Sequence, residues 1–290
     1  MGQTVYRDYD QEALDLQYDN QRRVAPFPAY RDGFFQRESE RVRAALGPEL
    51  GIGYGPSADE RLDVFRPAGA AGAPVLVFFH GGYWRALSAA DYAFVAEPIV
   101  AAGAVCVLVD YALMPAVRMA ELVRQCRAAL AWTQANIAGF GGDPDRIHIA
   151  GHSAGGHIVA MLLAADAPPG TGDVSAMVKS AVAISGLFDL EPIRLCYLNE
   201  TLGLSAEEAR AASPLYALPA RPTPLVACYG GAESEEFARQ STVYGEAVTA
   251  AGGVCEVRAI SGEDHMSIAA ALAAPDGELT GIILAQMGLR

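Results

Sequence analysis

One pentapeptide has the residue types and spacing of a serine nucleophile. Ser153 lies in Gly151-His-Ser-Ala-Gly155, which follows the apolar run 146–150 and precedes an alanine-rich stretch typical of a helix. A strand, a tight turn and a helix in this order expose a serine hydroxyl at the end of the strand. Glycines on both sides relieve the close approach of helix and strand, where a side chain would clash. We therefore expect Ser153 to attack an electrophilic acyl carbon.

Histidine is the usual base that takes the proton of a serine nucleophile. The chain has five histidines, and four of them are better explained by other roles. His148 lies within an expected strand and His157 one helical turn after the serine, so both are expected to pack in the interior. His152 occupies the variable position of the pentapeptide, and we expect its side chain to point away from the reacting centre. His80 belongs to a separate motif and is expected to anchor a loop by hydrogen bonds.

The remaining histidine, His265, lies in Ser261-Gly-Glu-Asp-His-Met-Ser267, directly after the last expected strand. A loop at that position can extend over the edge of a sheet and bring the imidazole to Ser153. The pattern therefore predicts His265 as the general base.

The third member of such a triad is a carboxylate that orients the imidazole and stabilises its charged form. With a nucleophile of this type, the acid lies between the serine and the histidine in the sequence. Glu233 follows one expected strand, and Asp189 follows the strand before it. We favour Glu233 and keep Asp189 as the alternative. Glu235 and Glu236 are expected to begin the next helix, where their charge complements its positive end.

Acyl transfer also requires hydrogen-bond donors for the negative charge that develops on the carbonyl oxygen. The segment His80-Gly-Gly-Tyr-Trp84 directly follows the expected strand 75–79, where a glycine-rich loop can supply such donors. We expect the donors of this oxyanion hole to be the backbone amides of Gly82, Tyr83 and Ala154, the last because it follows the nucleophile.

Strands and helices alternate from about residue 60 to the end of the chain. Strands are expected at 62–65, 75–79, 104–109, 146–150, 178–184, 223–229 and 254–260. Helices are expected near 90–102, 117–138, from 154 onward, and near 235–251 and 267–287. This alternation predicts an α/β fold, with a mostly parallel twisted sheet and helices on both faces. In open sheets of this kind, ligands bind beyond the carboxyl ends of the strands.

The chain is expected to fold as one domain, 1–290, because no internal repeat or long linker divides it. Residues 1–46 are expected to form an N-terminal helical segment that Pro26 and Pro28 interrupt. Residues 186–222 break the alternation of strands and helices, and we expect them to form a small cap over the site.

Composition and charge exclude several classes of protein. With 52% hydrophobic and 19% charged residues, the chain can bury a large core. Its formal net charge is -13 and it has no long run of Lys or Arg, which argues against a nucleic-acid partner. The five cysteines are scattered, which is typical of reduced core residues in a cytoplasmic protein. We find no metal-ligand cluster, signal segment or membrane span, and expect a cytoplasmic enzyme without metal or cofactor, with a homodimer as the default assembly.

These motifs resemble those of the α/β-hydrolase superfamily and, within its esterase–lipase branch, the kynurenine formamidase (arylformamidase) group. The resemblance covers most of the chain. It rests on the segments 18–20, 62–65, 80–84, 140–146, 151–155, 236–240 and 264–265. Tyr83-Trp84 is the most distinctive pair, because the general esterase group has a third glycine in this segment.

By this resemblance, the substrate would be an aryl N-formyl amide, typically N-formylkynurenine, cleaved to formate and an aromatic amine in tryptophan catabolism. Tyr83 and Trp84 would supply an aromatic platform for such a leaving group. The family usually has aspartate where this chain has Glu233. Relatives with the same signature also hydrolyse simple esters, so a carboxylesterase for short-chain or aryl esters is the alternative. The alternative of another class is a non-catalytic ligand receptor on a hydrolase scaffold.

Overall fold

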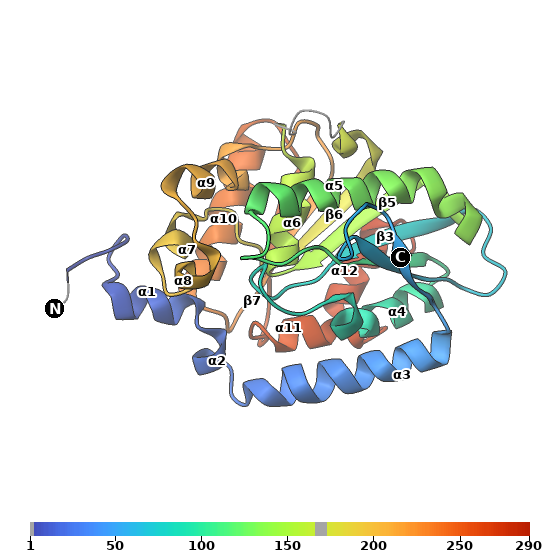
Figure 1. Ribbon diagram of the computed structural model, residues 1–290, viewed down its shortest axis with the longest axis horizontal. Coiled ribbons are helices and arrows are strands. Elements are labelled where there is room, and N and C mark those ends of the chain that lie inside the picture. Colours follow the sequence, from blue (N-terminus) through green and yellow to red (C-terminus); the bar gives the residue numbers. More distant parts are fainter. Residues whose placement is uncertain (1–2, 166–172) are drawn as a thin grey trace.

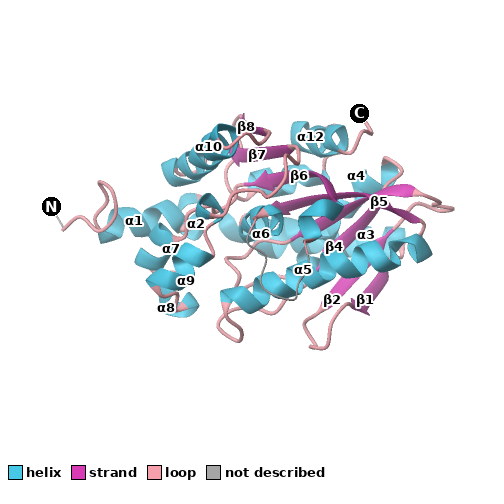
Figure 2. Ribbon diagram, turned by 90° about the horizontal axis from the view of Figure 1, so that it is seen from above, coloured by secondary structure: helices cyan, strands magenta, loops and turns pink. Residues whose placement is uncertain are grey.

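A single eight-stranded sheet forms the centre of the computed structural model, which describes residues 3–165 and 173–290. The strands are β1 (Glu49–Gly53), β2 (Arg61–Phe65), β3 (Ala73–Phe79), β4 (Val105–Val109), β5 (Gly142–His152), β6 (Val178–Ile184), β7 (Leu225–Gly230) and β8 (Cys255–Ile260). Their order in the sheet is β1-β2-β4-β3-β5-β6-β7-β8. Figure 1 labels β3, β5, β6 and β7, and Figure 2 labels the other four strands. All pairs from β4 to β8 are parallel, and β1 and β2 add an antiparallel edge. The predicted mostly parallel sheet is confirmed.

The first strand, β1, is the one that the sequence did not predict. It pairs only with β2 at the edge of the sheet, and most of its residues are exposed. An exposed edge strand needs no apolar run or alternation, so the sequence pattern does not mark it.

Helices cover both faces of the sheet, as Figure 2 shows from above. They are α1 (Gln11–Tyr18), α2 (Asn20–Arg23), α3 (Gln36–Leu46), α4 (Ala96–Ala101), α5 (Met119–Asn136), α6 (Ala154–Leu163), α7 (Glu191–Leu195), α8 (Asn199–Leu202), α9 (Ala206–Ala211), α10 (Glu235–Ala250), α11 (Ser267–Ala270) and α12 (Glu278–Gln286). Shorter 3-10 segments are η2 (Ala89–Val95), η3 (Ile137–Phe140), η4 (Val174–Met177), η5 (Pro214–Tyr216) and η6 (Ala271–Ala273), and η1 (Ala29–Phe35) is a π-helix.

The last predicted helix, 267–287, is divided in the structure. The stretch Ser267–Ala273 and α12 meet at an angle of 64°. Pro275 and Gly277 lie in the break, and neither favours a continuous helix. Across the described residues, no single helix has the length and apolar composition to cross a bilayer. The two parts of this bent pair reach that length and composition only when they are counted together.

The core is split by the sheet into two layers, and β3 shows how one strand serves both. Val75, Val77 and Phe79 belong to the cluster under α5, α6 and α10. Leu76 and Phe78 belong to the cluster under α3, α4, α11 and α12. Because successive side chains point to opposite faces, a strand covered on both sides must be apolar throughout. The continuous apolar run therefore predicted β3 correctly.

Two segments lie outside the alternation of strands and helices and add side chains to the core. The N-terminal segment forms α1, α2, η1 and α3, and Pro26 and Pro28 lie between α2 and η1 as predicted. The connection from β6 to β7 forms α7, α8, α9 and η5. Helix α1 lies beside α7 and α10, as both views show (Figures 1 and 2).

Candidate active site

Ser153 occupies a strained turn between β5 and α6. Its backbone has φ 57° and ψ −117°, values that a residue with a side chain rarely adopts. The neighbouring glycines have no room for a side chain: a Cβ at Gly155 would lie 2.0 Å from the carbonyl oxygen of Phe79. At Gly151 a Cβ would lie 2.4 Å from the carbonyl oxygen of Gly155. The turn therefore requires glycine on both sides of the serine.

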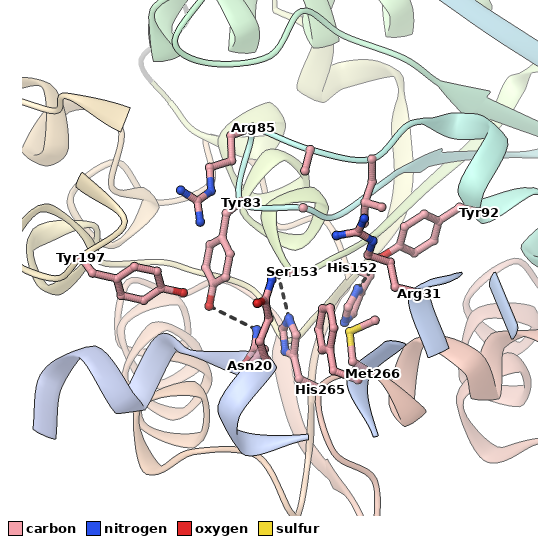
Figure 3. Close-up of a pocket in the computed structure, with 15 residues that line it drawn as sticks. Asn20, Arg31, Tyr83, Arg85, Tyr92, His152, Ser153, Tyr197, His265 and Met266 are labelled. Atoms are coloured by element: carbon pink, nitrogen blue, oxygen red, sulfur yellow. Dashed lines mark hydrogen bonds between the residues drawn. The ribbon is translucent and has the colours of Figure 1, made fainter. Parts of the chain in front are cut away.

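The structure brings Ser153, His265 and Glu233 together. Nε2 of His265 lies 3.0 Å from Oγ of Ser153, and its Nδ1 lies 2.5 Å from Oε1 of Glu233. The three side chains come from the β5–α6 turn, the loop after β8 and the loop after β7. Figure 3 shows the contact between Ser153 and His265. In this arrangement the hydroxyl proton can pass to the imidazole while the carboxylate accepts the Nδ1–H.

Glu233 is held by two further hydrogen bonds. Its Oε2 accepts from Oγ of Ser185 at 3.0 Å and from the backbone amide of Gly230 at 2.9 Å. The side chain is 1% exposed. One carboxylate oxygen is thus fixed by the protein, and the other is directed at His265.

Asp189, the alternative acid, has other partners. Its Oδ2 accepts from the hydroxyl of Tyr6 at 3.1 Å, and its Oδ1 accepts from the backbone amide of Glu191 at 3.1 Å. The guanidinium of Arg239 lies 3.9 Å away. Within the described part of the chain Asp189 makes no hydrogen bond to His265, so the geometry favours Glu233.

The loop after β3 has an unusual backbone at the predicted oxyanion hole. Gly82, Tyr83 and Trp84 all have positive φ, at 110°, 47° and 57°. Gly82 and Tyr83 line the same pocket as Ser153. The amides of Gly82, Tyr83 and Ala154 donate no hydrogen bond to an acceptor in residues 3–165 and 173–290. These three N–H groups are therefore available to an oxygen atom of a ligand.

The two aromatic residues of this loop point in different directions. Tyr83 lines the pocket, and its hydroxyl donates to the carbonyl oxygen of Tyr18 at 2.8 Å. Trp84 is fully buried in the core, and its indole N–H donates to Nδ1 of His157 at 3.1 Å. A buried indole needs such an internal partner, and it cannot touch a ligand. The prediction of a substrate contact is therefore wrong for Trp84 and becomes a proposal for Tyr83.

His152 does not point away from the reacting centre as expected. Its ring lines the pocket, with its centroid 4.7 Å from that of the His265 ring. Its Nδ1 forms a hydrogen bond with the hydroxyl of Tyr92 at 2.9 Å. Burial, and secondarily the neighbouring His265, holds the pKa of His152 well below its usual value. The ring is therefore neutral, and it packs beside the predicted base without adding charge.

The other three histidines are buried, as predicted. His148 hydrogen-bonds to Oγ of Ser180 at 2.7 Å, and both ring nitrogens of His157 have protein partners. His80 stacks on Tyr111 with ring centroids 4.3 Å apart and bonds to the carbonyl oxygen of the next residue. Burial lowers the pKa of each of these imidazoles to about 4. They serve packing and loop anchoring.

The pocket around Ser153 has a volume of about 120 Å³. Its lining includes Asn20 and Arg31 from the N-terminal segment, Arg85 from the loop after β3, and Tyr197 from the β6–β7 connection. The sequence analysis did not identify these four as site residues. Two of them had a local signal: Arg85 directly follows the His80–Trp84 segment, and Asn20 lies in the segment 18–20 that carries part of the family resemblance.

No cysteine lines this pocket among the described residues. All five cysteines are free. Burial raises the pKa of the Cys196 and Cys228 thiols to about 12. In the described residues no group of three or more His, Cys, Asp or Glu side chains is arranged to hold a metal ion.

The chain is similar in sequence to known hydrolases. A kynurenine formamidase from Danio rerio is 32% identical over 294 residues, covering 98% of this chain and 98% of the relative. The esterase LipC from Mycobacterium tuberculosis is 33% identical over 199 residues, 61% of this chain and 49% of the relative.

Solved structures share the same architecture. The crystal structure of a putative thioesterase from Silicibacter sp. has a TM-score of 0.82 and 29% identity, covering 93% of this chain and 98% of that one. A thermophilic esterase from Thermogutta terrifontis with bound butyrate has a TM-score of 0.67 and 25% identity, covering 84% and 95%. A family model described as the α/β-hydrolase fold matches residues 76–269, more than half of the chain. The protein therefore belongs to the α/β-hydrolase family.

Proposed function

We propose that this protein is a serine hydrolase that cleaves a small acyl amide or ester through an acyl-enzyme, with an aryl formamide such as N-formylkynurenine as its substrate. The observation that carries the proposal is the hydrogen-bonded series Ser153–His265–Glu233. The formamidase part is supported by the Danio rerio relative, which matches the chain over almost its whole length.

Each residue of the series would carry out one step of the reaction. Oγ of Ser153 attacks the acyl carbon while Nε2 of His265 takes the hydroxyl proton, and Glu233 stabilises the imidazolium that forms. His265 then returns the proton to the leaving amine or alcohol. Water, activated by the same imidazole, hydrolyses the acyl-enzyme and restores the serine.

The amides of Gly82, Tyr83 and Ala154 would stabilise the negative oxygen of the tetrahedral intermediates. They are backbone groups fixed before the reaction, so they need no reorganisation when the charge develops. The positive φ at Gly82 and Tyr83 supports this role, because such a backbone differs from an ordinary turn between strand and helix.

The second candidate is a carboxylesterase for short-chain or aryl esters, which the similarity to the butyrate-bound esterase favours. The two candidates differ in the size of the acyl group, because a formyl group needs almost no room beside the carbonyl carbon. Turnover of N-formylkynurenine, p-nitrophenyl acetate and p-nitrophenyl butyrate would separate them, and a clear preference for butyrate would end the formamidase proposal.

Labelling with a fluorophosphonate probe tests the nucleophile. We expect native protein to be labelled, and Ser153→Ala to lose labelling and about 10⁴- to 10⁶-fold in kcat, since the triad residues act as a unit. Ser241→Ala is the control, because Ser241 is a buried serine of α10 outside the triad. Failure of the native protein to react would support the receptor alternative instead.

The proposal extends to the whole molecule. We propose a single domain, 1–290, in which the β6–β7 connection forms a cap, a role supported by the position of Tyr197 in the pocket lining. A cytoplasmic location, which the five free and scattered cysteines support, and a homodimer complete the proposal. Cell fractionation and size-exclusion chromatography with light scattering would test them.

A further inference from the structure

The pocket around Ser153 contains two cationic side chains, Arg31 and Arg85, and no Asp or Glu among its described lining residues. This is unexpected in a chain with a formal net charge of -13. Arg31 is exposed and pairs with Asp32 at 2.9 Å. Arg85 is half-buried and forms no ion pair with a carboxylate of the described residues. Its charge is therefore available to a ligand.

The backbone of the loop after β3 directs Arg85 into the pocket. Trp84 is fully buried in the core, while its neighbours Tyr83 and Arg85 both line the pocket. The carbonyl oxygen of Gly82 accepts from the amides of Arg85 and Ala86, at 3.1 Å each. These bonds hold the positive-φ conformation in place. A strained conformation of this kind persists where the surrounding structure fixes it, commonly at a ligand site.

The guanidinium of Arg85 is positioned by a neutral partner. Its Nη1 donates to Oγ1 of Thr201 at 2.8 Å, and Thr201 lies in α8 of the β6–β7 connection. Arginine has five N–H donors in a planar fork, so this single bond leaves the others free. In Figure 3 the Arg85 side chain appears on the side of the view that holds Tyr83 and Tyr197, and Arg31 appears on the side of Tyr92.

A free guanidinium fork beside aromatic rings defines the chemistry of a ligand. The fork matches a carboxylate, which can accept two parallel hydrogen bonds from it. The rings of Tyr83 and Tyr197 offer apolar surface to an aromatic group attached to that carboxylate. A neutral ester or amide of the same shape would leave the cation without a counter-charge.

We propose that Arg85 is a specificity-determining residue that binds a carboxylate of the substrate. The preferred substrates are then acyl amides or esters whose leaving group carries both an aromatic ring and a carboxylate. This inference rests on the proposed function, because Ser153 is assigned the cleavage of the acyl group. Arg85 contributes binding and has no part in proton transfer.

Matched substrates that differ only in charge provide the test. One pair is 2-formamidobenzoate and 2-formamidobenzamide, and the other is 4-carboxyphenyl acetate and 4-carbamoylphenyl acetate. We expect native protein to have a KM roughly 10- to 100-fold lower for the carboxylate of each pair, the range for a hydrogen-bonded charged group.

Arg85→Gln should remove this preference by raising KM for the carboxylates alone. Arg85→Lys should keep part of it, and Arg31→Gln, the control cation across the pocket, should keep all of it.

A binding measurement separates this inference from the proposed function. Calorimetry with Ser153→Ala protein measures the affinity for 2-formamidobenzoate and 2-formamidobenzamide without turnover. If native protein hydrolyses neither these compounds nor N-formylkynurenine, but Ser153→Ala binds the carboxylate more tightly and loses this preference when Arg85→Gln is added, the proposed function fails and the carboxylate-binding role of Arg85 stands. If turnover occurs with equal KM for both members of each pair, the inference is overturned and the proposed function stands. The same holds if Arg85→Gln raises KM equally for both members.

Discussion

The loops after β6 and β7 both place a carboxylate near the carboxyl ends of the strands, but only one of them reaches the imidazole. In the loop after β7, Glu233 contacts His265 and is held from behind by Ser185 and Gly230. In the loop after β6, Asp189 binds Tyr6 of the N-terminal segment. Two acids that each follow a strand of the sheet therefore make different contacts.

The difference arises from the partners that each loop meets. The loop after β7 lies against the loop after β8, since the amide of Ala232 donates to the carbonyl oxygen of Glu263 at 2.9 Å. That contact brings Glu233 beside His265. The loop after β6 instead packs on α10, where Gln240 accepts from the amide of Asp189 at 2.8 Å. A position after a strand is enough to predict a candidate acid. The contact between neighbouring loops determines which of the two acids lies beside His265.

Removal of charge from each acid should give the largest contrast. Glu233→Gln leaves the imidazole without a carboxylate, and we expect kcat to fall about 10²- to 10⁴-fold. Asp189→Asn should lower kcat less than about 3-fold, because Asp189 does not touch the triad. Steady-state turnover of the best substrate by both variants measures the difference.

Glu233→Asp refines the same contrast. It keeps the charge but shortens the side chain by one methylene, and we expect a loss of about 10-fold, since small displacements in a triad are costly. Equal losses in Glu233→Gln and Asp189→Asn would refute the assignment of Glu233 as the acid. Circular dichroism of each variant would show whether the fold is intact.

Three buried histidines outside the predicted triad determine how stability should depend on pH. Burial lowers the pKa of His80, His148 and His157 to about 4, whereas an unfolded histidine has a pKa of about 6.5. Below pH 6.5 the unfolded chain therefore binds protons that the native rings do not. The free energy of unfolding should fall by up to about 2 kcal/mol per ring between pH 7 and pH 5.

Urea unfolding at pH 7, 6 and 5 measures this slope. His157→Gln is the informative variant, because it removes one titrating ring and keeps a side chain that can hydrogen-bond. We expect its slope to be shallower than that of the native protein. A stability that is constant or rises toward pH 5 would contradict the neutral, buried state of these rings.

The sequence predicted most of the fold because the amino-acid pattern of each central strand is enough to identify it as a strand. The continuous apolar runs of β3 and β4 are covered on both faces, and their burial is complete. Glu235 and Glu236 begin α10, as their charge at a helix start suggested. The exposed β1 and the break between α11 and α12 were missed, since edge pairing and helix bending depend on packing that no short window contains.

At the site, local motifs were predictable and side-chain directions were not. Ser153 follows from a strand–turn–helix pattern of a few residues, and the structure places it against His265. The directions of Trp84 and His152 depend on the positive φ of one loop and on packing against residues far away in sequence. The same holds for Arg85, whose environment is completed by Thr201 of α8.

The smallest predicted effect concerns Asp189, the acid that makes no hydrogen bond to His265 within the described residues. The Tyr6 hydroxyl donates to Asp189 and accepts from Nη2 of Arg239 at 3.2 Å, so it ties the N-terminal segment to the loop after β6. Tyr6→Phe keeps the ring and removes these bonds, which should lower the free energy of unfolding by about 1 kcal/mol and leave kcat unchanged. Tyr9→Phe is the matched control, because its hydroxyl makes one exposed contact of 3.4 Å with Glu235. If Tyr6→Phe instead lowered kcat tenfold at unchanged stability, the loop after β6 would contribute to the reaction and the contrast between the two acids would disappear.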